Sequence, residues 1–228
     1  MSDAITAICF DLDDTLCTYT QRGEDILESA FDRAGVEPLF SIGAFHNRYV
    51  DYLEESDGIE TLRRACFADL AVEAGHDPET GHAVANAFAS IRDQTSVGLL
   101  PGASAAVSAL GEEYGLGLIT NGAPEMQRAK LEAIGLAESF ETVVYAGHET
   151  RAKPDPEPFE VALEALEADP EHSVYVGNSF ESDVAGAHAA GMRPVWVPTS
   201  GAAETVPESG PNPEHVLESL AELPPVLR

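Results

Sequence analysis

The sequence predicts an α/β protein built on a doubly wound parallel β-sheet, with a helical segment inserted into it. Three observations carry this prediction. Short apolar segments alternate with amphipathic ones from residue 97 onward, residues 18–96 hold helical patterns with few strand signals, and an apolar run at residues 5–10 stops abruptly at a cluster of acids. A chain of 228 residues, 44% of them hydrophobic, can bury the core that such a sheet needs.

The first expected strand is residues 5–10, whose apolar side chains suit a buried position. The alternation after residue 97 is typical of a parallel sheet, because right-handed crossovers place helices on both of its faces. It predicts helices at 103–113, 124–134, 157–168, 182–190 and near 214–222, and strands at 116–120, 142–146, 173–176 and 194–197.

Residues 18–96 are expected to form a separate helical unit. Segments such as EDILESAFDRAG and TLRRACFADLAVEAG space their apolar residues as one face of a helix does. The predicted organisation is an α/β core domain made of residues 1–17 and 97–228 and a helical domain at residues 18–96, with hinges near 16–20 and 95–100.

Acidic residues dominate the charge of the chain. Asp and Glu total 40 against 12 Lys and Arg, which gives a formal net charge of −28. Repulsion on this scale disfavours nucleic acid and anionic membranes as partners, so small ligands are expected instead. Only two basic residues are lysines, Lys130 and Lys153. An acidic surface nearly without lysine indicates adaptation to a high-salt cytoplasm, where screening weakens the repulsion.

The cysteines and the N-terminal residues predict a cytoplasmic location. Cys9, Cys17 and Cys66 form no CxxC pair, and their odd number leaves no complete set of disulfides. The first residues, MSDAITAICFDLDD, lack the basic leader of a signal peptide. No apolar run approaches the roughly 20 residues that a membrane-spanning helix needs.

The first strand ends in the acidic sequence DLDDT. Asp11 and Asp13 are two residues apart, so in an extended chain their side chains leave on the same side. Two neighbouring carboxylates need a partner, and a divalent cation such as Mg²⁺ suits oxygen ligands. An acidic turn or a helix N-cap is the alternative interpretation.

Two later strand ends offer groups for an anion. Thr120, Asn121 and Gly122 provide a hydroxyl and backbone amides before a helix that begins at Pro124, although a plain strand-to-helix turn has the same pattern. Lys153 precedes a proline, which ties its direction to the loop. In a chain with two lysines, we interpret Lys153 as a functional cation at the mouth of the sheet, with a solvated surface charge as the alternative interpretation.

The last strand end, in VYVGNSFESDVAGA, carries Asn178 and Asp183. Both side chains have oxygens that could reach a cation. Capping of the following helix by Asn178 or Ser179, with Asp183 as a favourable charge near its N-terminus, is the alternative, and the two roles are compatible. Tyr175 and Trp196, within neighbouring strands, are expected to be core residues without a chemical role.

In order and spacing, FDLDDTL, LITNG, KPDP and VGNSFESDVAGA resemble the four motifs of the haloacid dehalogenase-like hydrolase superfamily. The resemblance covers nearly the whole chain. It implies a Rossmann-like core, and the helical segment between the first and second motifs resembles the cap domain that this family inserts at that position. Such a cap would act as a lid that excludes water and selects the substrate.

In members that act on phosphate esters, the resemblance implies that Asp11 is the nucleophile and forms an aspartyl-phosphate. Asp13 would then be the general acid and base. Thr120, the Asn121 amide and Lys153 would hold the phosphate oxygens, with Thr120 and Lys153 counted among the catalytic residues. The predicted substrate is a small phosphorylated metabolite, and a phosphomutase shares the same motifs.

The implied cofactor is Mg²⁺, bound by Asp11, the main-chain carbonyl of Asp13, Asn178 and Asp183. Most phosphatases of the family have Gly-Asp where this chain has Gly177-Asn178. Asparagine offers a neutral oxygen and leaves the site one negative charge short, which bears on its affinity for the metal.

Two other functions remain open from the sequence. Metal-free 2-haloacid dehalogenases of the same family use the first Asp to displace halide, but they usually have no carboxylate at the position of Asp13. Because halide needs no proton to leave, DLDDT favours phosphoryl transfer. The other is a catalytically weak binding or regulatory protein, which the presence of Asp11, Asp13, Thr120 and Lys153 disfavours.

Overall fold

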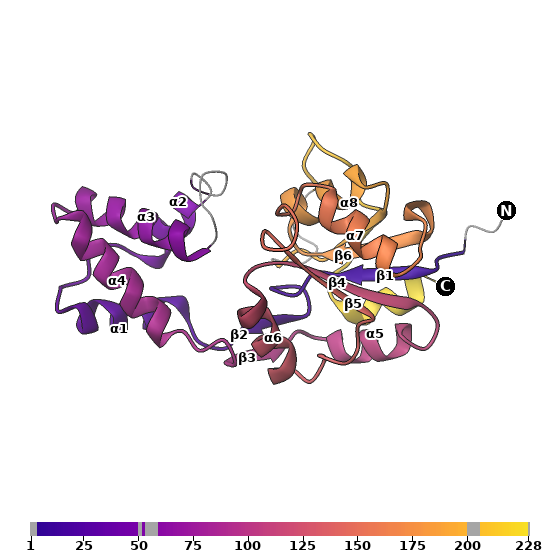
Figure 1. Cartoon of the computed structure of the whole chain (residues 1–228), viewed down its shortest axis with the longest axis horizontal. Coiled ribbons are helices and arrows are strands. Elements are labelled where there is room, and N and C mark those ends of the chain that lie inside the picture. The colour runs from indigo at the N-terminus through magenta and orange to yellow at the C-terminus, as the bar shows by residue number, and fades with distance from the viewer. Residues whose placement is uncertain (1–3, 50–51, 53–58, 200–205, 228) are drawn as a thin grey trace. The chain divides into compact units, whose positions relative to one another are not determined.

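The computed structural model describes residues 4–49, 52, 59–199 and 206–227 (Figure 1). The chain divides into two compact units. One consists of Met1–Thr18 and Val97–Arg228, and the other of Tyr19–Ser96. The second unit is a single insertion between two parts of the first. Its role as a cap stays a prediction.

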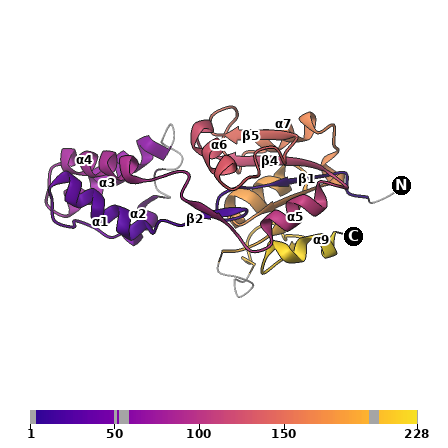
Figure 2. The same ribbon diagram turned by 90° about the horizontal axis from the view of Figure 1, so that it is seen from below.

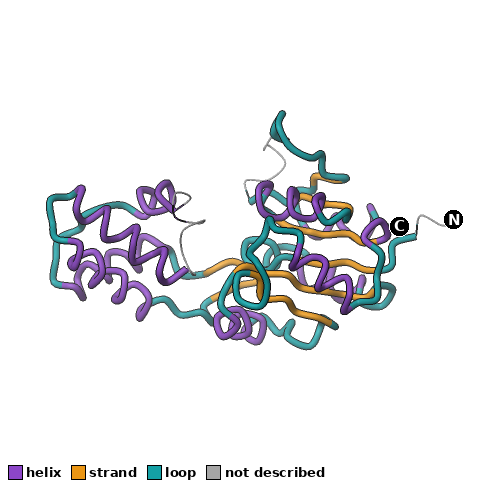
Figure 3. Tube along the Cα trace, turned by 45° about the horizontal axis from the view of Figure 1, so that its top comes forward, coloured by secondary structure: helices purple, strands orange, loops and turns teal. Residues whose placement is uncertain are grey.

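The first unit is organised around a six-stranded sheet, whose strands are orange in Figure 3. Each pair of neighbouring strands in it is parallel. The strand order is β5-β4-β1-β6-β7-β8, so β1 lies between β4 and β6. The strands are β1 (Ala7–Phe10), β4 (Gly115–Asn121), β5 (Thr142–Ala146), β6 (Ser173–Gly177), β7 (Arg193–Trp196) and β8 (His215–Val216).

Both faces of this sheet are covered by helices, as the alternation along β1 shows. Ile8 and Phe10 belong to the apolar cluster that includes α5 (Ala103–Leu110) and the first residue of α9 (Leu223–Val226). Cys9, between them, belongs to the cluster with α7 (Glu157–Ala165) and α8 (Ala185–Ala189). Successive strand residues point to opposite faces, so a strand buried on both sides is apolar throughout. Figures 1 and 2 show α5 and α7 on opposite sides of the sheet.

The second unit is helical and has a core of its own. Phe67 is fully buried there and makes edge-to-face contacts with Phe45 and Phe88, at ring-centroid distances of 5.1 and 5.7 Å. A side-chain carbon at Gly81 would lie 2.2 Å from the Phe67 carbonyl oxygen, so only glycine allows these two helices to approach so closely. The helices are α1 (Gly23–Ala34), α2 (Ile42–Tyr49), α3 (Ile59–Glu73) and α4 (Pro78–Ile91).

The predicted fold class is confirmed, with several differences in detail. A short two-stranded sheet, β2 (Cys17–Tyr19) with β3 (Val97–Leu99), forms where hinges were expected. The predicted helix at 182–190 is divided into a π-helical turn, η3 (Phe180–Val184), and α8.

The prediction of a helix near 214–222 is wrong. The segment instead forms β8 and a 3₁₀ turn (η4, Leu220–Glu222), and α9 begins only after it, at Leu223. The free edge of β7 explains the difference, because the Leu217 amide donates a hydrogen bond to the Trp196 carbonyl at 2.9 Å. Unpaired backbone groups at a sheet edge bind a passing extended segment.

Candidate active site

Four loops at one edge of the sheet carry the predicted site residues. Asp11 follows β1 directly, Thr120 and Asn121 end β4, and Asn178 follows β6. Lys153 lies in the loop between β5 and α7. Because β4, β1 and β6 are neighbours in a parallel sheet, their carboxyl ends meet at the same edge.

The loop after β1 is a tight turn. The Leu12 carbonyl accepts a hydrogen bond from the Cys17 amide at 3.1 Å, and the Asp14 amide donates to the Cys17 carbonyl at 2.7 Å. Asp14 has a φ of 57°, a left-handed conformation that a short polar side chain tolerates. The turn leaves Asp11 and Asp13 to contact two different lysines.

The ammonium group of Lys153 is surrounded by oxygens. It lies 2.8 Å from Asp11 Oδ1, 2.7 Å from Asp183 Oδ1, 2.8 Å from Tyr175 Oη and 3.0 Å from the Ile119 carbonyl oxygen. An ammonium has three hydrogens for these four oxygens. The Tyr175 hydroxyl also donates a hydrogen bond to the Ile119 carbonyl oxygen, at 3.0 Å. The buried lysine is therefore fully hydrogen-bonded.

Burial and charge fix the protonation of this group. Burial alone would lower the pKa of Lys153, but the charges of Asp11 and Asp183 and the hydrogen bonds to them raise it above its ordinary value. Burial raises the pKa of Asp11 to about 7, against the attraction of Lys153. Burial and the Asp183 charge also raise the pKa of Tyr175. A permanent positive charge thus lies beside Asp11.

Asp13 is held by a second set of side chains, from α6 (Pro124–Ala133). Lys130 Nζ lies 2.7 and 2.8 Å from its two carboxylate oxygens. Gln127 Nε2 donates to Asp13 Oδ2 at 2.9 Å, and it also lies 2.9 Å from Thr120 Oγ1. Lys130, Gln127 and Thr120 are all buried. The carboxylate after the first strand is thereby connected to the threonine of the second.

Asn121 fixes the loop that carries Lys153. Its side-chain oxygen accepts from the Lys153 amide at 2.9 Å, and its side-chain nitrogen donates to the Lys153 carbonyl at 3.1 Å. The peptide bond between Lys153 and Pro154 is cis. The side chain of Asn121 therefore positions Lys153, and its main-chain amide is left as the predicted phosphate ligand.

Asp183 is buried, and both of its oxygens accept hydrogen bonds. Oδ1 faces Lys153 and Tyr175, and Oδ2 accepts from the Ser179 amide at 2.9 Å. A side-chain carbon at Gly177 would lie 2.4 Å from Asp183 Oδ2, so only glycine at the end of β6 leaves room for this carboxylate. These contacts make Asp183 an anchor for Lys153.

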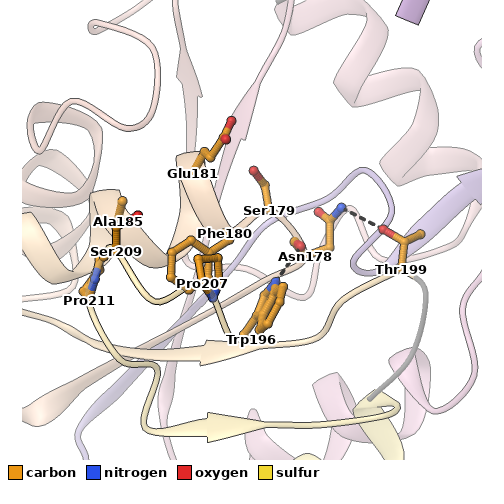
Figure 4. A pocket seen from close by; sticks show the side chains of 11 residues that line it. Asn178, Ser179, Phe180, Glu181, Ala185, Trp196, Thr199, Pro207, Ser209 and Pro211 are labelled. Carbon is orange, nitrogen blue, oxygen red and sulfur yellow. Dashed lines mark hydrogen bonds between the residues drawn. The ribbon is translucent and has the colours of Figure 1, made fainter. Parts of the chain in front are cut away.

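Asn178 has a defined orientation (Figure 4). Its side-chain nitrogen faces the Thr199 hydroxyl at 3.4 Å, and Trp196 Nε1 donates to its main-chain oxygen at 2.8 Å. Its side-chain oxygen lies 3.1 Å from Thr15 Oγ1, which is itself 3.1 Å from Asp11 Oδ2. Thr15 thus connects the amide oxygen of Asn178 to the carboxylate of Asp11.

A hollow of about 680 Å³ lies beside Asn178 (Figure 4). The rings of Phe180 and Trp196 line it and meet edge to face at 5.4 Å. Among the described residues that line this hollow, Asn178 is the one predicted site residue. We therefore assign the hollow no part in the reaction.

The structure brings Asp11 and Asp183 each into direct contact with Lys153, and it joins Asp13 to Thr120 through Gln127. Tyr175 is in the core as predicted, but its contact with Lys153 was missed. The other residues that the sequence analysis did not single out are Thr15, Gln127 and Lys130. For Lys130, the scarcity of lysine in the chain was an available signal.

The fit of the site to a metal rests on few side chains. Among the residues that the structure describes, no three His, Cys, Asp or Glu side chains lie close enough to bind one ion. Asp11 Oδ2 and Asn178 Oδ1, each 3.1 Å from Thr15 Oγ1, remain as a carboxylate and an amide oxygen near one point. Mg²⁺ is commonly held by one or two carboxylates together with water and substrate phosphate. The residues present fit such an ion, with Asp11 as the single carboxylate.

Comparison with known proteins identifies the family of this chain. The chain matches the haloacid dehalogenase-like hydrolase family over residues 5–191 and belongs to that family of hydrolases. The resemblance drawn from the four motifs is confirmed. No helix among the described residues is long and apolar enough to cross a membrane.

Three similar proteins illustrate the range of the family. The phosphoserine phosphatase of Thermus thermophilus is 33% identical over an alignment of 236 positions, and the match covers 90% of this chain and 93% of that protein. The glyceraldehyde 3-phosphate phosphatase of Pyrococcus furiosus is 29% identical over 227 residues, which cover 98% and 93%. The crystal structure of a 2-haloacid dehalogenase from Pseudomonas syringae is 27% identical, with a TM-score of 0.68 and 98% of each chain covered.

Proposed function

We propose that this protein is a Mg²⁺-dependent phosphohydrolase that cleaves a small phosphate monoester through an aspartyl-phosphate on Asp11. The main support is the ammonium of Lys153, which lies 2.8 Å from the Asp11 carboxylate and is anchored by Asp183. A carboxylate can attack a phosphate dianion only where fixed positive charge offsets their repulsion. The two phosphatases similar to this chain support the same class of reaction.

In the proposed first step, a carboxylate oxygen of Asp11 bonds to phosphorus while the bond from phosphorus to the alcohol oxygen breaks. Asp13 gives its proton to the departing alcohol and becomes a carboxylate. In the second step, water attacks phosphorus and Asp13 takes a proton from that water. The bond between phosphorus and Asp11 breaks, inorganic phosphate leaves, and both aspartates return to their starting state.

Lys153 and Thr120 would hold the phosphate oxygens during both steps. Lys153 has a fixed direction because Asn121 binds its main chain on both sides. The Thr120 hydroxyl accepts a hydrogen bond from Gln127, so its own hydrogen is available for a phosphate oxygen. The Asn121 amide is the remaining proposed phosphate ligand.

Asp11, the Asp13 main-chain carbonyl and Asn178 would hold Mg²⁺, and the ion would supply positive charge against the phosphate oxygens. The family resemblance also places Asp183 among the Mg²⁺ ligands. Both of its oxygens already accept hydrogen bonds, from Lys153 and from the Ser179 amide, so the role proposed for it here is to act through Lys153. Because Asn178 is neutral, Asn178→Asp should bind Mg²⁺ more tightly, on the order of tenfold, since affinity follows the charge of the ligands. Calorimetric titration of both proteins with Mg²⁺ alone measures this without reference to activity, and unchanged affinity would exclude residue 178 as a ligand.

The substrate we propose is a small phosphorylated metabolite with a hydroxyl leaving group. Phosphoserine and glyceraldehyde 3-phosphate are the first compounds to test, because the similar phosphatases are named for them. We also propose that residues 18–96 act as the cap. A compact helical insertion joined to the core by two segments suits a lid that closes over a bound substrate.

The function is tested by phosphate release from phosphate esters, with Mg²⁺ or with EDTA, in KCl concentrations that keep the protein folded. We expect Mg²⁺-dependent release by the wild type and none by Asp11→Asn, whose amide is not a nucleophile. Halide release from 2-chloropropionate is measured in parallel. Halide release without phosphate release would support a dehalogenase. The absence of both activities would support a binding protein.

A further inference from the structure

Two side chains that take part in no bond-making or proton-transfer step of the proposed reaction, Lys130 and Gln127, are buried and contact Asp13. They lie one turn apart on α6. Lys130 Nζ contacts both carboxylate oxygens of Asp13, at 2.7 and 2.8 Å, and Gln127 Nε2 contacts Oδ2 at 2.9 Å. Three hydrogen bonds from two side chains therefore fix the orientation of one carboxylate.

The orientation of the Gln127 side-chain amide satisfies its nitrogen and leaves its oxygen without a hydrogen bond among the described residues. Its nitrogen faces three oxygens, those of Asp13, Thr120 and the Asn121 main chain. Its side-chain oxygen is buried and has no hydrogen-bond partner among the described residues. An unpaired buried oxygen destabilises a fold, so an apolar side chain here would serve stability better. The adjoining strand end also makes room for Gln127, because a side-chain carbon at Gly122 would lie 2.5 Å from Gln127 Nε2.

Asp13 does not need these partners in order to remain in the fold. Its side chain is 36% exposed, whereas that of Lys130 is 3% exposed. Water could solvate the carboxylate if Lys130 were absent. We infer that these contacts serve to orient Asp13. Orientation matters for a general acid, because it must lie within hydrogen-bond reach of the leaving oxygen.

From this geometry we propose that Lys130 and Gln127 are positioning residues for proton transfer by Asp13, and that Gln127 couples Asp13 to the phosphate ligand Thr120. The inference rests on the proposed phosphohydrolase function. It concerns the first step in particular, in which Asp13 delivers its proton to the departing alcohol.

The test compares two esters that differ in their need for that proton. Nitrophenyl phosphate has a leaving group that is stable as an anion, whereas the glycerol of glycerol phosphate leaves as an alkoxide unless its oxygen is protonated. The value of kcat/KM reports only steps up to the first irreversible one, so it isolates leaving-group departure. Lys130→Met and Gln127→Leu are the test variants. Arg128→Met removes an exposed cation from the same helix and is the matched control.

For Lys130→Met and Gln127→Leu we expect kcat/KM for glycerol phosphate to fall at least about tenfold more than that for nitrophenyl phosphate, because general acid catalysis contributes about 10²–10⁴-fold. Loss of charge near the phosphate would affect both esters equally and leave their ratio unchanged. In an Asp13→Asn background, Lys130→Met should produce no further change in the ratio. Gln127→Leu should unfold at the same or a higher urea concentration than the wild type.

Equal losses on the two esters would overturn the positioning role. So would a Lys130→Met substitution that changes the ratio of kcat/KM values as much in the Asp13→Asn background as in the wild type. A change of ratio in Arg128→Met matching that of Lys130→Met would overturn it as well. Failure of the proposed function looks different, because the wild type would then hydrolyse neither ester. A wild type that hydrolyses both, with variants of unchanged ratio, refutes only the inference.

Discussion

The two lysines of the chain contact different aspartates of the first motif, Asp11 and Asp13, in different environments. The side chains of Lys153 and Asp11 are 2% and 9% exposed, and Asp183 also contacts Lys153, at 2.7 Å. The side chain of Lys130 is 3% exposed, but that of its partner Asp13 is 36% exposed. One pair is closed to water and the other has an open side. This difference suits a nucleophile that must be shielded and an acid and base that must exchange protons with water.

The largest effect should follow from removing the cation of the closed pair. Lys153→Met leaves Asp11 and Asp183 buried without a positive partner, which should lower the free energy of unfolding by about 3–5 kcal/mol. Lys130→Met leaves a carboxylate that water can reach, so its loss should be about 1 kcal/mol or less. Urea unfolding at pH 8 measures both variants. Equal losses would show that the two pairs do not differ as described.

The pH dependence of stability should sharpen the contrast. Burial raises the pKa of Asp11 to about 7, above the 3.8 of a free aspartate, so between these values the folded state binds more protons than the unfolded state. The contribution of Asp11 to stability is therefore fully present below pH 4 and is lost as the pH rises toward 7. The expected slope is at most about 1.4 kcal/mol per pH unit.

The measurement is the difference in unfolding free energy between wild type and Asp11→Asn from pH 4 to pH 8. Asparagine does not titrate in this range. We expect the advantage of the wild type to decrease with rising pH and to level off above pH 7. A difference that grows with pH would mean that Lys153 lowers the pKa of Asp11 by more than burial raises it.

A smaller effect is expected from the hydroxyl of Tyr175. Tyr175→Phe keeps the ring and its edge-to-face contact with Phe159, at 4.9 Å, but removes a hydrogen-bonding partner of Lys153. The loss should be about 1 kcal/mol, the usual net contribution of one buried hydrogen bond. Tyr145→Phe is the matched control, since its hydroxyl contacts the exposed Arg128. Equal losses of stability would show that the Tyr175 hydroxyl contributes no more than the Tyr145 hydroxyl does.

Salt should separate buried from exposed charges. With a net charge of −28, the wild type should become more stable as KCl screens the repulsion at its surface. The deficit of Lys153→Met should change by less than about 0.5 kcal/mol over the same range, because buried pairs are screened little. A deficit that disappears in high salt would mean that this pair is solvated.

The parallel sheet could be predicted because its strands are apolar on both faces and alternate with helices. Lys153 could be predicted because it stands before a proline at a strand end. Lys130 and Gln127 occupy ordinary polar positions within a helix, and only the packing of α6 beside the sheet edge buries them. The contact of Tyr175 likewise depends on a loop distant in sequence. The apolar spacing around Leu217 and Leu220 fits a helix, but the free edge of β7 favoured a strand.

The central claim is that Asp11 carries the phosphoryl group between two steps, the second of which needs Asp13. Its most direct test is a rapid-mixing experiment on Asp13→Asn with nitrophenyl phosphate and Mg²⁺, followed by mass spectrometry of the quenched protein. We predict a burst of nitrophenol close to one equivalent per protein, slow turnover afterwards, and a phosphoryl group on Asp11. Nitrophenol release without a burst, or a phosphoryl group on any other residue, would contradict the account.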